Sequence, residues 1–103
     1  MTTSLRERRE TAFACARVAL EMLAERGIEA CLVGELARGD FRLHSPVDVL
    51  VESPIADHLE LASEIDWCFR GSTLSVEIMF SECVDDAEYA RMTRHMLYLE
   101  DLS

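Results

Sequence analysis

Two short apolar runs on either side of a glycine-bounded segment constrain this chain more than any other feature. Residues 28–33 form a mostly apolar run that ends at Gly34. Residues 47–51, Val-Asp-Val-Leu-Val, form a second run with a lone acid, Asp48, between two valines. Runs of this length and composition predict strands. Residues 34–45 predict a loop with a helical turn at its start.

The rest of the chain shows helical and strand patterns around these two runs. Ser53 and Pro54 supply an N-cap and a first-turn proline, and Asp85 with Glu88 three residues later is a variant of the capping box. The expected order is a helix over residues 4–26, strands over 28–33 and 47–51, a helix over 54–70, a strand over 74–80 and a helix over 86–101. This order predicts one α/β (α+β) domain, residues 1–103, with helices flanking a small three-stranded mixed sheet.

The charge of the chain restricts its partners. The net charge is −10, the acidic excess lies beyond Gly27, and every basic residue is an arginine. An acidic surface repels the phosphates of nucleic acids, so we expect no nonspecific nucleic-acid binding. A basic protein is the better match for such a surface.

The cysteines and the hydropathy indicate an ordinary intracellular domain. The four cysteines lack the close spacing of a zinc knuckle, so we expect small buried thiols in a reducing compartment: Cys15, Cys31, Cys68 and Cys83. No apolar run approaches the roughly 20 residues of a membrane helix, and the charged N-terminus leads into no signal-peptide core. We therefore expect a cytoplasmic protein with no membrane partner.

The residues from Gly34 to Val51 carry a family resemblance. Gly34-Glu35-Leu36-Ala37-Arg38-Gly39, followed by Ser45-Pro46-Val47-Asp48, resembles the signature of the minimal nucleotidyltransferases. These are small proteins with the polymerase-β-like nucleotidyltransferase fold. Their signature is Gly-Ser, two residues, Arg-Gly, a short loop, then Ser-Asp-x-Asp and an apolar strand. The resemblance covers roughly residues 28–80 and implies a nucleotidyltransferase-like core.

The resemblance also implies a set of site residues. Family members hold two divalent cations with two aspartates at i and i+2 and a third acid from a neighbouring strand, because phosphoryl transfer needs hard oxygen ligands. Asp48 matches the second aspartate, and Glu77 lies on the polar side of the third predicted strand, where the third acid would be. Both are therefore candidate catalytic residues and candidate magnesium ligands. The candidate nucleotide-binding residues are Gly34, Glu35, Arg38 and Gly39.

Two departures from the signature predict a degenerate site. Pro46 stands where the family has its first aspartate, and a proline cannot bind a metal. Glu35 stands where the family has serine, and its carboxylate would repel the triphosphate.

Structural roles alone could explain the same residues. A strand acid such as Asp48 or Glu77 is often simply solvated. Arg38 could pair with Glu35 or Asp40 in a weak surface ion pair.

Three functions remain open. The preferred one is a degenerate nucleotidyltransferase-fold protein that binds a protein, as antitoxins of this family bind a HEPN-type toxin, with or without forming a homo-oligomer. The second is an active enzyme that transfers AMP from Mg-ATP to a protein or small molecule. There Asp40, Glu35 or His44 would replace the lost aspartate beside Asp48 and Glu77. The third is an unrelated α/β domain.

A binding role predicts an acidic interface with an apolar centre. The candidate rim residues are exposed acids of the second and last helices, namely Asp57, Glu60, Glu64, Glu88 and Glu100. The candidate centre is Tyr89, Met92, Met96 and Tyr98, because aromatic residues and methionine are enriched in interface cores. If the last helix extends to residue 101, Met96 and Tyr98 lie about 200° apart around it, and one of the two must face away from the sheet.

Overall fold

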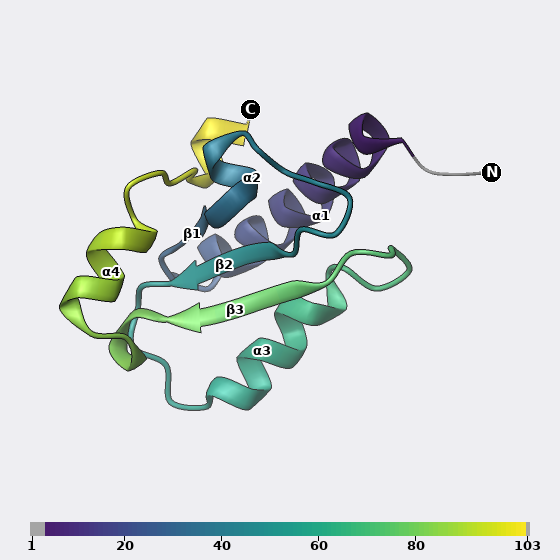
Figure 1. Ribbon diagram of the computed structural model, residues 1–103. Coiled ribbons are helices and arrows are strands. Elements are labelled where there is room, and N and C mark those ends of the chain that lie inside the picture. The colour runs from purple at the N-terminus through teal and green to yellow at the C-terminus, as the bar shows by residue number, and fades with distance from the viewer. Residues whose placement is uncertain (1–3, 103) are drawn as a thin grey trace.

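A three-stranded mixed sheet lies at the centre of the fold (Figure 1). The computed structural model describes residues 4–102. Strand β1 (Ala30–Val33) pairs antiparallel with β2 (Val47–Val51), and β2 pairs parallel with β3 (Val76–Phe80). Helix α3 (His58–Trp67) lies between β2 and β3 in the chain, as the crossover between two parallel strands requires. The predicted α+β class with a three-stranded mixed sheet is confirmed.

One face of the sheet is covered by α1 (Leu5–Glu25) and α3. Helix α1 starts at the predicted place, because the Ser4 hydroxyl accepts a hydrogen bond from the backbone N–H of Glu7 at 3.1 Å. Its buried stripe joins the inward side chains of the strands and of α3 in the main core: Ala12, Ala16, Ala19, Leu20 and Leu23. Burial of a side chain such as Leu23 stabilises the fold by about 1.5–3 kcal/mol.

The other face carries a smaller apolar cluster beneath α4 (Asp86–Met92) and the C-terminal segment. Asp85 begins α4 as predicted, since its carboxylate accepts a hydrogen bond from the N–H of Glu88 at 2.8 Å. The short 3-10 helix Ser81–Cys83 connects β3 to α4. The cluster consists of Cys31, Val33 and Leu50, with Met79, Met92, Met96 and Tyr98 packed against them.

The predicted helix over residues 86–101 is wrong beyond Met92. The Thr93 hydroxyl donates to the carbonyl of Tyr89 at 2.7 Å where the helix ends. Leu97 then pairs with Leu32 on the free edge of β1, with N–H···O distances of 2.8 and 3.0 Å. Pairing with this edge satisfies backbone groups that a longer helix would leave open. A 3-10 helix, Leu99–Leu102, follows.

Because α4 ends at Met92, both Met96 and Tyr98 lie in the extended segment after it and not on a helix. Both flank Leu97, and both are half-buried against the same face of the sheet. Alternate residues of an extended segment point the same way. The expectation that one of the two faces away from the sheet is therefore wrong.

The start of α3 also differs from the prediction. Asp57, not Ser53, caps this helix, and its carboxylate accepts from the N–H of Glu60 at 3.0 Å. Ser53 instead accepts a hydrogen bond from the N–H of Glu29 at 2.8 Å. Ser53, the predicted cap, is therefore engaged in a tertiary contact with Glu29 instead of capping α3. Within residues 4–102, no helix is long and apolar enough to cross a membrane.

Candidate functional site

Asp48 and Glu77 lie directly opposite each other on the parallel strands β2 and β3. Val33 of β1 is the partner of Asp48 on its other side, so the three residues form a row across one face of the sheet. This is the face covered by α4. The predicted placement of the two acids on neighbouring strands and on one face is confirmed. Their predicted catalytic and metal-binding roles remain predictions.

The carboxyl group of Asp48 is half-buried and holds a proton more tightly than usual. Burial, a side-chain hydrogen bond with Glu77 and the negative charges of Glu77 and Glu35 raise the pKa of Asp48 to about 7, against a smaller opposite effect of Arg38. Below this pH the neutral Asp48 carboxyl group can donate its hydrogen bond to Glu77.

Gly34 makes the close approach of the chain to Asp48 possible. Its φ of 73° is in the left-handed region, and a Cβ atom added to it would overlap the Asp48 carboxyl group, whose carbon would be 2.9 Å away. Only glycine avoids both the strain and the overlap. The signature glycine thus brings the start of α2 (Gly34–Arg38) against the acid of β2.

The remaining signature residues are placed by local contacts. The Glu35 carboxylate accepts a hydrogen bond from the hydroxyl of buried Ser45. Arg38 forms an exposed ion pair with Asp40, N···O 3.5 Å, which is one of the two pairs expected of it. Gly39 ends α2 in the left-handed conformation, φ 88°.

The surroundings of Asp48 and Glu77 differ from those of a three-acid magnesium site. Within residues 4–102, no group of three or more His, Cys, Asp or Glu side chains is placed to hold a metal ion. Burial and the neighbouring acids raise the pKa of Asp48 to about 7, and Pro46 occupies the position of the first signature aspartate. Asp40 is paired with Arg38, and His44 is exposed in the loop before β2. Neither joins the two acids in a metal-binding group.

Two arginines and a histidine that the sequence analysis left without a role lie across a cavity from Asp48. An open cavity of about 390 Å³ is lined by Gly34, Arg38 and Asp48 on one side, and by the end of α4 and the turn after it on the other. That second side contributes Arg91, Arg94 and His95. Arginine side chains are therefore gathered at this cavity, although the protein as a whole is acidic. The i, i+3 spacing of Arg91 and Arg94 is the one sequence signal that could have pointed to it.

Comparisons with known proteins relate the chain to others by structure. No family model and no curated protein sequence matches it. Among solved structures it is similar to a proposed nucleotidyltransferase from Sulfolobus solfataricus, with a TM-score of 0.53 over 94% of this chain and 86% of that chain. The sequence identity is 17%. Such a likeness concerns the fold alone. This chain therefore has a nucleotidyltransferase-like fold, as its signature residues predicted.

Proposed function

We propose that this chain is a nucleotidyltransferase-fold protein with a degenerate metal and triphosphate site, and that it acts by binding a basic protein partner. The first half is supported by Pro46 at the position of the first signature aspartate and by the half-buried Asp48, whose pKa burial and its acidic neighbours raise to about 7. Metal-assisted phosphoryl transfer needs ionised oxygen ligands in sufficient number. An acid that is only partly ionised near neutral pH, with a proline in place of the first aspartate, is a poor replacement for three ionised acids.

The binding half rests on an exposed apolar site over α1 and α3. Trp67, at the end of α3, is 65% exposed. It borders an apolar hollow of about 320 Å³, which is also lined by Met22 of α1 and Cys68. The guanidinium of Arg70 lies 4.3 Å from the ring centroid of Trp67 and supports it from one side. An exposed tryptophan beside a hollow is typical of a site that anchors a partner.

The predicted interface centre lies elsewhere and is mostly covered. Met92, Met96 and Tyr98 pack on the sheet. Tyr89, at 37% exposed, donates its hydroxyl hydrogen bond to Glu52 at 3.2 Å. We therefore place the centre of the proposed interface at Trp67.

Charge indicates the chemistry of the partner. Helix α3 and its cap carry four acids and no lysine or arginine: Asp57, Glu60, Glu64 and Asp66. This surface complements a basic segment that also places an apolar side chain in the hollow beside Trp67. By the family resemblance, we propose a HEPN-type toxin as that partner.

A site-specific photo-crosslinker tests the binding proposal. It is placed at Trp67 in the source cell and, as a control away from α3, at Leu43, which is 51% exposed in the loop before β2. We expect an adduct at residue 67 with a basic ribonuclease. That protein, once purified, should lose its activity on addition of this chain, and Trp67→Ala should weaken the effect at least tenfold.

Equal adducts at the two positions would contradict the proposal. So would a purified adduct protein that the wild-type chain neither binds nor inhibits.

The active enzyme is the second candidate, and the basic cavity favours it. Arg38, Arg91 and Arg94 could neutralise the phosphates of a nucleotide close to Asp48. Incubation with Mg²⁺ and ATP labelled in its α-phosphate distinguishes the two candidates. Label transferred to this chain or to the crosslinked partner, and lost in Asp48→Asn, would favour the enzyme. No transfer favours the binding protein.

A further inference from the structure

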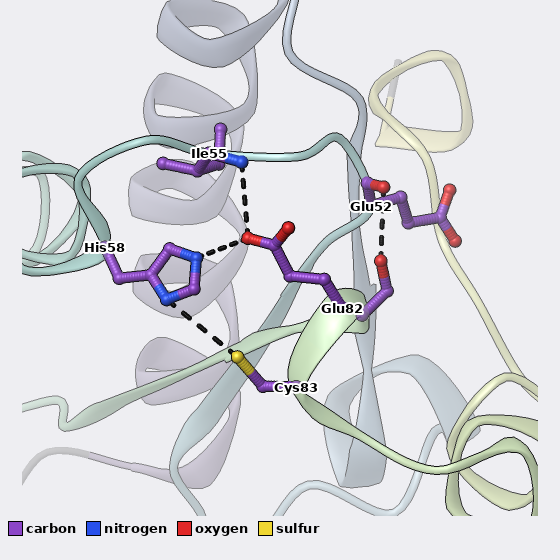
Figure 2. Close-up of polar contacts among 6 residues, drawn as sticks. Glu52, Ile55, His58, Glu82 and Cys83 are labelled. Atoms are coloured by element: carbon purple, nitrogen blue, oxygen red, sulfur yellow. Dashed lines mark hydrogen bonds and ion pairs between the residues drawn. The ribbon is translucent and has the colours of Figure 1, made fainter.

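A separate side-chain cluster lies away from Asp48, at the start of α3. This is the end of the helix opposite Trp67. Figure 2 shows Cys83, His58 and Glu82 side by side where the chain leaves β3. The Cys83 sulfur lies 3.9 Å from Nδ1 of His58, and the other ring nitrogen, Nε2, contacts the Glu82 carboxylate. Cys83 is exposed, so its thiol is accessible to solutes.

The imidazole in this cluster is fixed in both position and plane. Its ring stacks on Phe80 with 4.0 Å between centroids and 8° between planes. Glu82 is itself held by the N–H of Ile55, which donates to its carboxylate at 3.3 Å. The 3-10 helix that carries Glu82 and Cys83 is tied to the residue after β2 by Ser81, whose hydroxyl donates to the carbonyl of Glu52 at 3.1 Å.

Glu82 determines which ring nitrogen of His58 can act as a base toward the Cys83 thiol. The hydrogen bond from His58 and that from the Ile55 backbone lower the pKa of the Glu82 carboxyl. An ionised carboxylate accepts, so Nε2 carries the hydrogen and the lone pair of Nδ1 faces Cys83. A base that contacts a thiol and is oriented by a third group is the arrangement of an activated nucleophile.

We propose that Cys83 is a nucleophilic thiol, activated by His58 and oriented through Glu82, that forms mixed disulfides with small cationic disulfides. Nothing in the nucleotidyltransferase-like fold requires it, and it is independent of the proposed partner. The preference for a cation follows from the carboxylates of Asp57 and Glu82, which line the open hollow around the thiol.

The step is a thiol–disulfide exchange. The Cys83 thiol gives its proton to Nδ1 of His58, and its sulfur attacks one sulfur of the disulfide. A new S–S bond forms as the old one breaks. The leaving thiolate takes the proton from His58, so one thiol is consumed and one is released.

The three other thiols provide an internal comparison. Burial raises the pKa of Cys15, Cys31 and Cys68, that of Cys31 to about 12. Thiolates are the reacting form, so these three should react slowly in the folded protein. Cleavage after arginine places each of the four cysteines on a different peptide. Mass spectrometry can therefore follow all four in one sample.

The probes are cystamine, neutral 2-hydroxyethyl disulfide and an anionic aromatic disulfide. At pH 7 we expect Cys83 in the folded protein to react with cystamine at least about tenfold faster than Cys83 in the urea-unfolded chain. The three other cysteines should react more slowly folded than unfolded. The folded-to-unfolded ratio for Cys83 should fall from the cationic to the neutral to the anionic probe.

Variants separate activation from simple exposure. His58→Phe keeps the stacking on Phe80 and should bring the Cys83 rate down to that of the unfolded chain at pH 7. The Cys83 rates of the wild type and of His58→Phe should become similar at pH 9, where hydroxide removes the thiol proton without help from His58. Glu82→Gln should lower the rate less and weaken the preference for cystamine.

A wild-type Cys83 that reacts no faster folded than unfolded overturns the proposal without any variant. A folded His58→Phe protein with the wild-type rate overturns it as well. Equal ratios for the three probes would contradict the charge preference.

Discussion

Asp48 and Glu77 lie opposite each other on parallel strands, and a hydrogen bond joins their carboxyl groups. A family enzyme needs acids in these positions as ionised metal ligands. Here the half-buried Asp48 keeps a proton up to about pH 7. The hydrogen bond between the two carboxyl groups also links β2 to β3.

Asp48→Asn should make the protein more stable at high pH. Between the ordinary value of 3.8 and about 7, the folded state keeps a proton on Asp48 that the unfolded state releases, so the contribution of Asp48 to the free energy of unfolding falls as pH rises through this window. Asparagine stays neutral and can still donate to Glu77. After discounting for solvent screening, we expect a gain of about 1–2 kcal/mol at pH 8 and no gain at pH 4.

Urea unfolding at the two pH values measures this difference. Asp66→Asn, an exposed acid on α3, is the control and should show no such pH-dependent gain. A variant that is destabilised equally at pH 4 and pH 8 would show that Asp48 is ionised in the folded state.

Gly34→Ala should destabilise the protein by about 2–4 kcal/mol, because the added Cβ combines a left-handed backbone with overlap on the Asp48 carboxyl group. Gly71→Ala is the matched control. Gly71 also has positive φ, 89°, but open space around it, so its cost should be about 1 kcal/mol. Chemical denaturation gives both values. Asp48→Ala in the Gly34→Ala background should recover part of the loss, and equal costs for the two glycines would contradict the close approach.

The double variant Glu35→Ser with Pro46→Asp should gain magnesium-dependent ATP affinity. It removes a carboxylate from the proposed triphosphate position and restores an aspartate two residues before Asp48. Glu35→Ser alone should gain less, since it adds no metal ligand. Calorimetric titration of both variants is the measurement. Equal affinities for the double variant and the wild type would mean that the surrounding pocket does not accept a nucleotide.

The sequence predicted the sheet because its patterns are strong and local. Residues 47–51 are β2 as predicted, and α1 and α2 follow their expected starts closely. The predicted first and third strands begin two residues earlier than β1 and β3. The positions of Asp48 and Glu77 were predictable because a strand alternates its side chains with a fixed period.

The end of the chain could not be predicted from local patterns. Residues 86–101 are rich in helix formers, yet Leu97 pairs with Leu32 instead. Local propensity is a weak prior, and an unpaired strand edge competes with it. A helix to residue 101 would have kept Arg91, Arg94 and His95 on one face, because they are spaced three and four residues apart. Their grouping at the cavity beside Asp48 was therefore open to prediction from their spacing, whereas the pairing of Leu97 with Leu32 was not.

Calorimetric titration of the wild-type chain with ATP, in the presence and absence of magnesium, tests the central claim most directly. If the metal site is degenerate, magnesium adds no affinity, and any ATP binding through the arginines of the cavity is weak, with a dissociation constant of about 1 mM or higher. Micromolar affinity that depends on magnesium would contradict the proposed function, because it would require Asp48 and Glu77 to act as ionised metal ligands.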